Sequence, residues 1–314
     1  MRILITGGAG CLGSNLVEHW VPVGHQLHLI DNFATGKREV VPAHPLVGLT
    51  EGSVADWTLV DRTVANFKPD VVVHSAASYK NPADWREDIA TNILGSVNIV
   101  RACESSGVRR LINFQTALCY GRPDRLPIPV TAPTRPFTSY GISKTAGEQY
   151  VLAASVPAIS LRLANITGPR LAIGPIPTFY KRLKAGQSCF CSDTVRDFLD
   201  IADFLSLMDM AIQPEAPVGS FNVSTGEGRS IKDVFDAVSA YLNITPASPV
   251  PIVPPAADDV AAVVLEPAET ERAFGWKAAI GFSDIIARQL AWYDRHGVTD
   301  VYSHLTAPQM ERER

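Results

Sequence analysis

Short, continuous apolar runs alternate with longer amphipathic ones through the first half of the chain, and this rhythm strongly constrains the fold. Runs that are apolar on both faces are typical of buried strands, and they occupy residues 2–6, 26–31, 71–75, 110–116 and 159–165. Apolar residues at helical spacing fill the intervening stretches, residues 12–20, 57–67, 89–106 and 140–153. Strands that alternate with helices in this way predict a parallel sheet with right-handed crossovers and helices on both faces.

The second half of the chain has a looser rhythm, because prolines cluster after Gly168 and again between Pro246 and Pro255. Helix-like stretches are separated there by irregular segments, and they are residues 177–185, 231–242 and 283–296. We expect an α/β fold in two parts. One is a doubly wound parallel-sheet domain of residues 1–168, to which residues 197–223 return, and the other is a smaller α/β substrate lobe of residues 169–196 and 224–314.

A glycine-rich turn follows the first strand-like run, in the sequence Thr6-Gly7-Gly8-Ala9-Gly10-Cys11-Leu12-Gly13. The spacing of Gly7, Gly10 and Gly13 allows a tight turn, close approach of a pyrophosphate, and a helix N-terminus that points at it. The second run ends in Asp31, whose carboxylate can accept both adenosine ribose hydroxyls and would repel a 2′-phosphate. Together they predict a Rossmann-type dinucleotide site that prefers NAD to NADP.

Tyr140 and Lys144 lie four residues apart in a segment expected to be helical, so their side chains share one face. A free tyrosine has a pKa near ~10, which is too high for an efficient base at neutral pH. A positive charge within about 4–6 Å favours the phenolate, so we expect Lys144 to lower the pKa of Tyr140. Such a tyrosine can accept a hydroxyl proton while a hydride leaves the attached carbon, and can later return it. The same spacing is common on solvated helix faces, so the catalytic interpretation needs the other motifs.

Composition excludes several classes of function. Of the 314 residues, 46% are hydrophobic and 19% are charged, and the net charge of −4 gives no general attraction to nucleic acid or acidic lipid. No apolar run approaches the ~20 residues that span a bilayer, and the N-terminus has no signal-peptide organisation, so we expect a cytoplasmic protein without a membrane segment. The scattered cysteines, among them Cys189 and Cys191, lack zinc spacing, so no metal is expected.

Further motifs follow in a fixed order along the chain. Beyond the glycine turn they are Asp31-Asn32, Glu51-Gly52-Ser53-Val54, His74-Ser75-Ala76-Ala77, Asn92, Phe114 to Gly121, Tyr140 with Lys144, Leu161 to Asn165, Gly168-Pro169-Arg170, Arg196-Asp197-Phe198, Phe221 to Gly226 and Phe274-Gly275-Trp276. In these motifs and their order the chain resembles the extended short-chain dehydrogenase/reductases of the nucleotide-sugar epimerase/dehydratase family, to which UDP-glucose 4-epimerase belongs.

The resemblance implies roles for the matching positions. Tyr140, Lys144 and Thr116 would be catalytic, with the Thr116 hydroxyl bonding the reacting oxygen and Lys144 also binding the nicotinamide ribose. NAD is the implied cofactor, and its implied contacts are Gly7, Gly10, Cys11, Leu12, Gly13, Asp31, Asn32, Phe33, Thr35, Gly36, Ser53, Val54, Ala76, Ala77, Asn92, Tyr140 and Lys144. The implied partner is a nucleoside diphosphate sugar, with Lys80, Thr116, Asn165 and Arg196 as candidate contacts.

The reaction that these residues support most directly is inversion at C4 of the sugar through a transient 4-keto intermediate. Related dehydratases carry Asp-Glu directly after the catalytic threonine, where this chain has Ala117 and Leu118, so we expect epimerisation. Dehydration with a lysine such as Lys80, or net reduction with release of the cofactor, are the alternatives. A dinucleotide sensor without catalysis is a more distant one.

Two departures from the family pattern concern the substrate. The family's Arg-x-Gly-Asp is replaced by residues 255–260 without a basic residue, and the loop before Arg196 is short. We therefore expect an unusual sugar nucleotide or a different phosphate grip. The closest likeness is to enzymes of bacterial surface-polysaccharide (lipopolysaccharide) clusters. Relatives also form a two-fold dimer through helices that correspond to residues 89–106 and 140–153, so a homodimer is expected.

Overall fold

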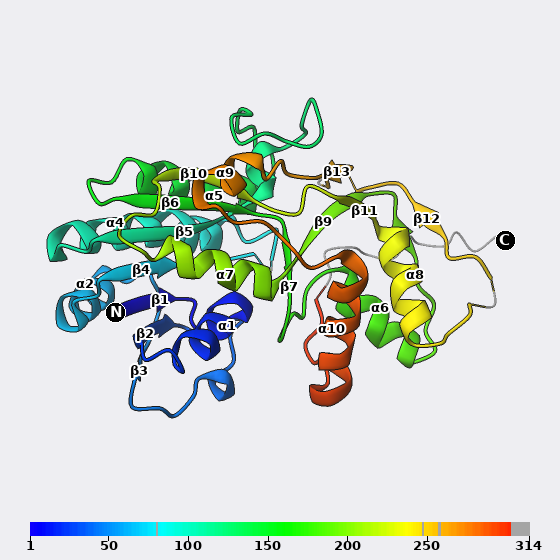
Figure 1. The fold of residues 1–314 in the computed structure, drawn as a ribbon, viewed down its shortest axis with the longest axis horizontal. Helices are drawn as coiled ribbons and strands as arrows, with labels where there is room; N and C mark the ends of the chain where they lie inside the picture. Colours follow the sequence, from blue (N-terminus) through cyan, green and yellow to red (C-terminus); the bar gives the residue numbers. More distant parts are fainter. Residues whose placement is uncertain (80, 247, 257–258, 303–314) are drawn as a thin grey trace.

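The core of the protein is a seven-stranded sheet in the order β10-β6-β5-β4-β1-β2-β3 (Figure 1). The computed structural model describes residues 1–79, 81–246, 248–256 and 259–302. All neighbours in this sheet pair in parallel. The strands are β1 (Arg2–Thr6), β2 (Gln26–Asp31), β3 (Val47–Glu51), β4 (Val71–His74), β5 (Arg110–Thr116), β6 (Ala158–Leu163) and β10 (Gly219–Val223). The order reverses beside β1, and ligands of such sheets bind at the carboxyl ends of the strands around that point.

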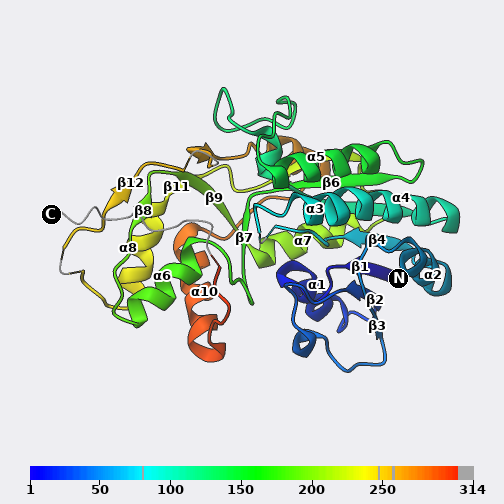
Figure 2. The same cartoon turned by 180° about the vertical axis from the view of Figure 1, so that it is seen from behind.

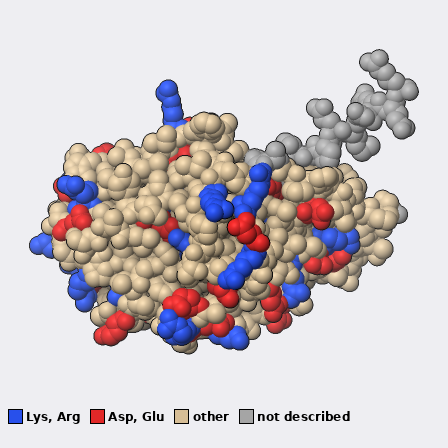
Figure 3. Space-filling model, turned by 90° about the horizontal axis from the view of Figure 1, so that it is seen from above, with Lys and Arg blue, Asp and Glu red and all other residues tan. Residues whose placement is uncertain are grey.

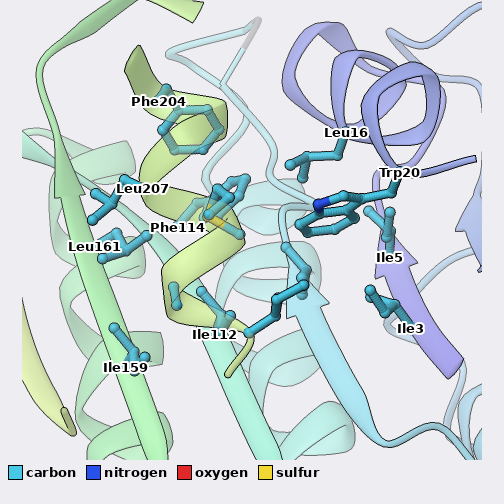
Figure 4. Close-up of a cluster of buried hydrophobic side chains, with 14 of the residues drawn as sticks. Ile3, Ile5, Leu16, Trp20, Ile112, Phe114, Ile159, Leu161, Phe204 and Leu207 are labelled. Atoms are coloured by element: carbon cyan, nitrogen blue, oxygen red, sulfur yellow. The ribbon is translucent and has the colours of Figure 1, made fainter. Parts of the chain in front are cut away.

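Helices cover both faces of the sheet (Figures 1 and 2). The helices α1 (Cys11–Trp20) and α7 (Ile201–Ala211) lie on one face, and α2 (Trp57–Phe67), α4 (Gly95–Ser106) and α5 (Ser139–Leu152) lie on the other. Side chains alternate along each strand, so β1 sends Ile3 and Ile5 into the first layer and Leu4 into the second. Figure 4 shows Trp20 of α1 and Phe204 of α7 in the first layer. A sheet buried on both faces requires these continuous apolar strands.

The C-terminal lobe lies at one end of the sheet and has its own apolar core (Figure 1). Three helices pack around this core, α6 (Pro175–Lys184), α8 (Ile231–Tyr241) and α10 (Phe282–His296). Its strands form two small sheets, one of β7 (Asn165–Thr167), β9 (Val195–Asp200), β11 (Gly228–Ser230) and β13 (Ala262–Val263), and one of β8 (Cys191–Ser192) and β12 (Ile252–Val253). The short helix α9 (Ala268–Phe274) packs against β10 of the large sheet.

The predicted α/β parallel-sheet class is confirmed, and most predicted elements lie within one or two residues of those observed. Two predicted elements are divided in the structure. The strand expected over 159–165 ends at Leu163, and β7 begins at Asn165 in another sheet. The helix expected over 89–106 begins earlier, as α3 (Trp85–Asp88), and passes through a π-helical segment (Ile89–Leu94) into α4. Strands β3 and β10 and helix α7 were not predicted as elements.

The surface carries charges of both signs. Figure 3 shows basic and acidic side chains interspersed over the described part of one face, without a continuous field of either sign. In the described ranges, no helix combines the length and the apolar character that crossing a bilayer would need.

Candidate active site

A cavity of about 1020 Å³ runs from the carboxyl ends of the central strands into the C-terminal lobe. Its walls at one end come from the glycine turn after β1 and from Asp31 at the end of β2. Tyr140 and Lys144 of α5 also line the cavity. Ser192 and Arg196 of the small sheets line it from the other lobe. Both halves of the molecule therefore contribute to one site.

The glycine turn has almost no room for side chains. Gly7 has a φ of +67°, and a Cβ there would lie 2.9 Å from the Ala76 backbone. At Gly13 a Cβ would lie 2.3 Å from the Gly7 carbonyl oxygen, so the helix start packs directly under the turn. Gly10 caps α1 without a side-chain hydrogen bond, and Cys11 at the first helical position lines the cavity. The amide dipoles at this helix start suit a pyrophosphate.

The Asp31 carboxylate is 7% exposed and is held by two backbone amides. The Ala9 N–H donates to Oδ2 at 2.9 Å, and the Phe33 N–H donates to Oδ1 at 2.8 Å. Each oxygen keeps further acceptor capacity. Because Asp31 lines the cavity, its carboxylate oxygens can accept hydrogen bonds from two vicinal hydroxyls. Its negative charge would repel a phosphate in their place.

His74, at the end of β4, joins three elements through one chain of hydrogen bonds. The Ala76 N–H donates to Thr6 Oγ1 at 3.1 Å, and Thr6 Oγ1 lies 2.8 Å from His74 Nδ1. On the other side His74 Nε2 lies 3.0 Å from Ser96 Oγ, which donates to the Asn92 carbonyl at 2.7 Å. Because the Ser96 hydroxyl donates to Asn92, its oxygen accepts from His74, so Nε2 carries a proton. Burial, with a smaller effect of Lys144, lowers the pKa of His74 to about 3.

Most of the predicted site residues line the cavity. Those that do are Gly7, Gly10, Cys11, Leu12, Asp31, Asn32, Thr35, Ser53, Val54, Ala76, Ala77, Thr116, Tyr140, Lys144, Asn165 and Arg196. Lys80 lies outside the described residues.

Four residues predicted to contact the cofactor are not in the cavity wall, and they are Gly13, Phe33, Gly36 and Asn92. The Asn92 amide is engaged within the protein, because it bonds both the N–H (2.9 Å) and the carbonyl (3.0 Å) of Ser78. It also donates to Ser143 Oγ at 3.0 Å. Asn92 therefore connects the loop after β4 to α5. The expected direct contact of Asn92 with the cofactor is not what the structure shows. Gly36 similarly packs against Ala9, where a Cβ would lie 2.9 Å away.

Thr116, Tyr140 and Lys144 come together in the cavity wall. Thr116 ends β5, and α5 begins just before Tyr140, with the Thr138 hydroxyl as its N-cap accepting from the Gly141 N–H at 3.1 Å. Burial raises the pKa of Tyr140, nearby Tyr79 and Asp88 raise it further, and a hydrogen bond with Thr116 lowers it. The predicted lowering of the phenol pKa by Lys144 is not observed, because desolvation dominates and Lys144 is not among these influences.

The Lys144 ammonium is buried, with 3% of the residue exposed, and its nitrogen has no hydrogen bond or ion pair with any residue that the structure describes. Burial lowers the pKa of Lys144 to about 8, while the charge of Glu148 raises it. A buried ammonium needs acceptors. Because Lys144 lines the cavity, its three donors are available to a bound molecule that offers hydroxyl oxygens.

Two buried side chains that hold α5 in place were not identified from the sequence. Gln115 donates to the Lys144 carbonyl at 3.0 Å and accepts from the Thr116 N–H at 2.8 Å, so it joins the end of β5 to α5. Glu148 is fully buried and pairs with Arg162 of β6 at 3.0 Å. The sequence signal for Gln115 and Glu148 was a polar residue in a strand or helix expected to be buried. It does not identify their hydrogen-bond partners, which are distant in the sequence.

The predicted substrate residues in the C-terminal half are engaged with protein groups. Asn165 donates to the Asp197 carbonyl at 2.9 Å. Arg196 forms an ion pair with Asp259 at 2.5 Å and donates to the Val260 carbonyl at 2.8 Å. Burial lowers the pKa of Arg196, and Asp259 raises it. Asp259 stands in the segment without basic residues, so an acidic group faces the cavity there.

Comparison with known proteins places this site in a family. The model of the NAD dependent epimerase/dehydratase family matches residues 3–224. The chain belongs to the NAD-dependent epimerase/dehydratase family. A UDP-glucose 4-epimerase of Corynebacterium glutamicum is 30% identical over 308 residues, which cover 88% of this chain and 90% of the relative.

Solved structures agree with this assignment to the epimerase/dehydratase family. The Bordetella bronchiseptica enzyme WbmG, in complex with NAD and UDP, is 65% identical, with a TM-score of 0.94 over 98% of this chain and 99% of that one. The enzyme WbmH of the same organism, in complex with NAD+, is 36% identical, with a TM-score of 0.89 over 95% and 99% of the two chains. The prediction of NAD as the cofactor is confirmed.

The residues of the cavity fit NAD. The start of α1, which has no side-chain cap, suits the pyrophosphate, and the Asp31 carboxylate suits the adenosine ribose. The Lys144 ammonium, which has no partner among the residues that the structure describes, suits the second ribose. Polar groups with unused hydrogen-bonding capacity thus lie in the cavity wall, where a dinucleotide offers complementary groups.

Proposed function

We propose that the protein is an NAD-dependent epimerase that inverts C4 of a nucleoside diphosphate sugar through a transient 4-keto sugar. The observation that carries this proposal is the convergence of Thr116, Tyr140 and Lys144 in one cavity with the glycine turn and Asp31. That cavity continues into the C-terminal lobe, so a sugar nucleotide can meet the dinucleotide at the phenol. We assign NAD to residues 1–168 with 197–223, and the sugar nucleotide to residues 169–196 and 224–314.

Tyr140 is the proton acceptor and donor in this mechanism. When bound, NAD supplies a hydride acceptor that later returns the hydride to the opposite face of C4. Tyr140 accepts the C4 hydroxyl proton in the first half and returns it in the second. The Thr116 hydroxyl lies close enough to the phenol to lower its pKa, so it can hold the reacting oxygen beside the phenol. Lys144 holds the nicotinamide ribose, and an ammonium stabilised by those hydroxyls favours the phenolate.

The wall beside Thr116 favours epimerisation over dehydration. Ala117 and Leu118, which follow Thr116, both line the cavity and cannot move a proton. Elimination of water needs an acid and a base in addition to the tyrosine. Dehydration and net reduction remain the alternatives that the experiment must separate.

We propose that the nucleotide is uridine diphosphate, which is the nucleotide in the WbmG complex. Its diphosphate would lie beside Arg196, whose guanidinium is fixed by Asp259 and by two backbone carbonyls. A planar, held guanidinium suits phosphate oxygens. Arg182, which lines the same cavity and donates to the Ser188 carbonyl at 2.7 Å, is a second cation for the nucleotide.

A cytoplasmic homodimer in bacterial surface-polysaccharide (lipopolysaccharide) biosynthesis is the setting that we propose. Large apolar side chains are exposed around α5 and the π-helical segment, including Ile142 (50%), Tyr150 (51%) and Ile89 (56%). Such a patch is unfavourable in water and is typical of an interface. Ile142→Asp should convert the dimer to a monomer in light scattering. Val23→Asp, at an exposed site (66%) outside this patch, should leave the dimer intact.

The test of the proposed reaction is to incubate the purified protein with UDP-, dTDP-, GDP- and CDP-sugars and follow C4 by NMR. Inversion without net NADH is the expected outcome, and Tyr140→Phe should abolish it. A 4-keto-6-deoxy product would establish a dehydratase. A requirement for stoichiometric cofactor would establish a reductase.

A further inference from the structure

Asp88 is a buried carboxylate in the cavity wall that the mechanism above does not use. It is the last residue of α3, and the π-helical segment Ile89–Leu94 follows directly. The residue is 1% exposed and lines the same cavity as Tyr140. Single π-helical turns are frequent at functional sites.

Within the described part of the chain, one of the two Asp88 oxygens has a hydrogen-bond partner and the other has none. Oδ2 accepts from Ser139 Oγ at 2.6 Å, and Ser139 is the first residue of α5, directly before Tyr140. Oδ1 is buried without a hydrogen-bond partner among the described residues. Burial of a carboxylate oxygen without a donor is unfavourable for folding. A purely structural clamp on Ser139 would be served better by a neutral acceptor.

The groups that act on the Tyr140 phenol come from several elements. Burial has the largest effect and raises the phenol pKa, Tyr79 and Asp88 raise it as well, and the hydrogen bond with Thr116 lowers it. Lys144 lies one turn further along α5 and lines the same cavity. Of the residues that act on the phenol, Asp88 is the carboxylate.

We propose that Asp88 is a positioning residue, which fixes the start of α5 through Ser139 and places a negative charge beside the Tyr140 phenol. A negative charge disfavours a neighbouring phenolate, so the phenolate that forms is a stronger base. In the reaction step, the O–H bond of the C4 hydroxyl breaks and its proton passes to Tyr140. The C4–H bond breaks with its electron pair passing to NAD, and the C4=O bond forms. The catalytic consequence rests on the proposed function, whereas the effect on the phenol does not.

The test is a spectrophotometric titration of the phenol in NAD-loaded protein, with Tyr140→Phe subtracted to isolate the Tyr140 signal. Asp88→Asn keeps an acceptor for Ser139 and removes the charge. It should form phenolate at a pH lower by about one unit. If that variant does not fold, Asp88→Ser is a second variant without the charge, with the same expected shift. The titration needs no sugar substrate, so a failed epimerase assay cannot mask its result.

Asp84→Asn is the matched control, because Asp84 is four residues earlier and lines the same cavity. It should titrate as the parent does. Ser139→Ala removes the clamp and keeps the charge, so it should not lower the phenol pKa. An Asp88→Asn protein that titrates with the parent overturns the proposal, as does a Ser139→Ala or Asp84→Asn protein with the same downward shift. In turnover, Asp88→Asn should move the acidic limb of the rate profile to lower pH by the same amount.

Discussion

The neutral imidazole of His74 should make the stability of the fold depend on pH in a defined way. Hydrogen bonds hold both ring nitrogens, Nδ1 to the Thr6 hydroxyl and Nε2, which donates, to the Ser96 oxygen. A second proton, on Nδ1, would place a positive charge in a site without water-exposed surface. The pKa of His74 accordingly falls from 6.5 to about 3, chiefly because of burial.

The sign and size of the effect follow from the two pKa values. Between pH 6.5 and about pH 3 the unfolded chain binds a proton at His74 that the folded chain excludes, so stability falls as the pH falls. The stabilising contribution is complete above pH 6.5 and is lost on acidification at ~1.4 kcal/mol per pH unit. Moving from about pH 7 to about pH 5 should therefore remove about 2 kcal/mol through this residue.

The assay is urea unfolding of the parent and of His74→Asn at both pH values. The variant should be less stable at neutral pH because it loses part of the hydrogen-bond chain, but its stability should fall by about 2 kcal/mol less on acidification. Carboxylates contribute equally to both proteins and cancel in the comparison. His44→Asn, at an exposed position, should fall as the parent does. Equal losses in the parent and in His74→Asn would refute the neutral, network-bound imidazole.

Three further substitutions test the site and its support. Asp31→Asn should weaken NAD binding about tenfold or more and relax discrimination against NADP, as measured by fluorescence titration; unchanged preference would contradict the assigned role. Gly13→Ala places a Cβ 2.3 Å from the Gly7 carbonyl oxygen, so the turn must shift and NAD should no longer stay bound through gel filtration. Glu148→Gln leaves Arg162 buried without its carboxylate partner. The free energy of unfolding, measured in urea, should fall by about 3 kcal/mol. A loss below about 1 kcal/mol would show that the Arg162 guanidinium reaches solvent in the variant.

The central strands could be predicted from the sequence because a strand buried on both faces needs a continuous run of apolar residues. The runs 2–6, 26–31 and 110–116 agree with β1, β2 and β5 at both ends. The edge strand β3 was missed, because its residues are only partly buried and its sequence has no continuous apolar run. Helix α7 was missed for the opposite reason, since its sequence is apolar on much of its circumference and shows no clear helical period.

Most of the cavity residues could be predicted because glycine turns and polar residues at strand ends are recognisable from short stretches of sequence. Long-range partners have no such signal. The ion pair of Arg196 with Asp259 joins residues far apart in the sequence, and the Asp88–Ser139 bond joins two helices. For the same reason Asn92 was expected at the cofactor, whereas its amide bonds Ser78 and Ser143. Local patterns predict which residue types gather, and packing decides which of them face the cavity.

The ionisation of Tyr140 and Lys144 also depends on burial that their spacing in the sequence does not reveal. In the proposed mechanism it links cofactor binding to proton transfer. Desolvation opposes charge on either group, so it raises the pKa of Tyr140 and lowers that of Lys144 to about 8. Hydroxyl oxygens placed on the Lys144 ammonium would stabilise its charge, and a stable ammonium would in turn favour the phenolate. Lys144→Met should therefore raise the pH at which Tyr140 ionises in NAD-loaded protein, as well as weaken NAD binding. If only NAD binding weakened and the phenol titration stayed in place, the ammonium would be a cofactor ligand without influence on the base.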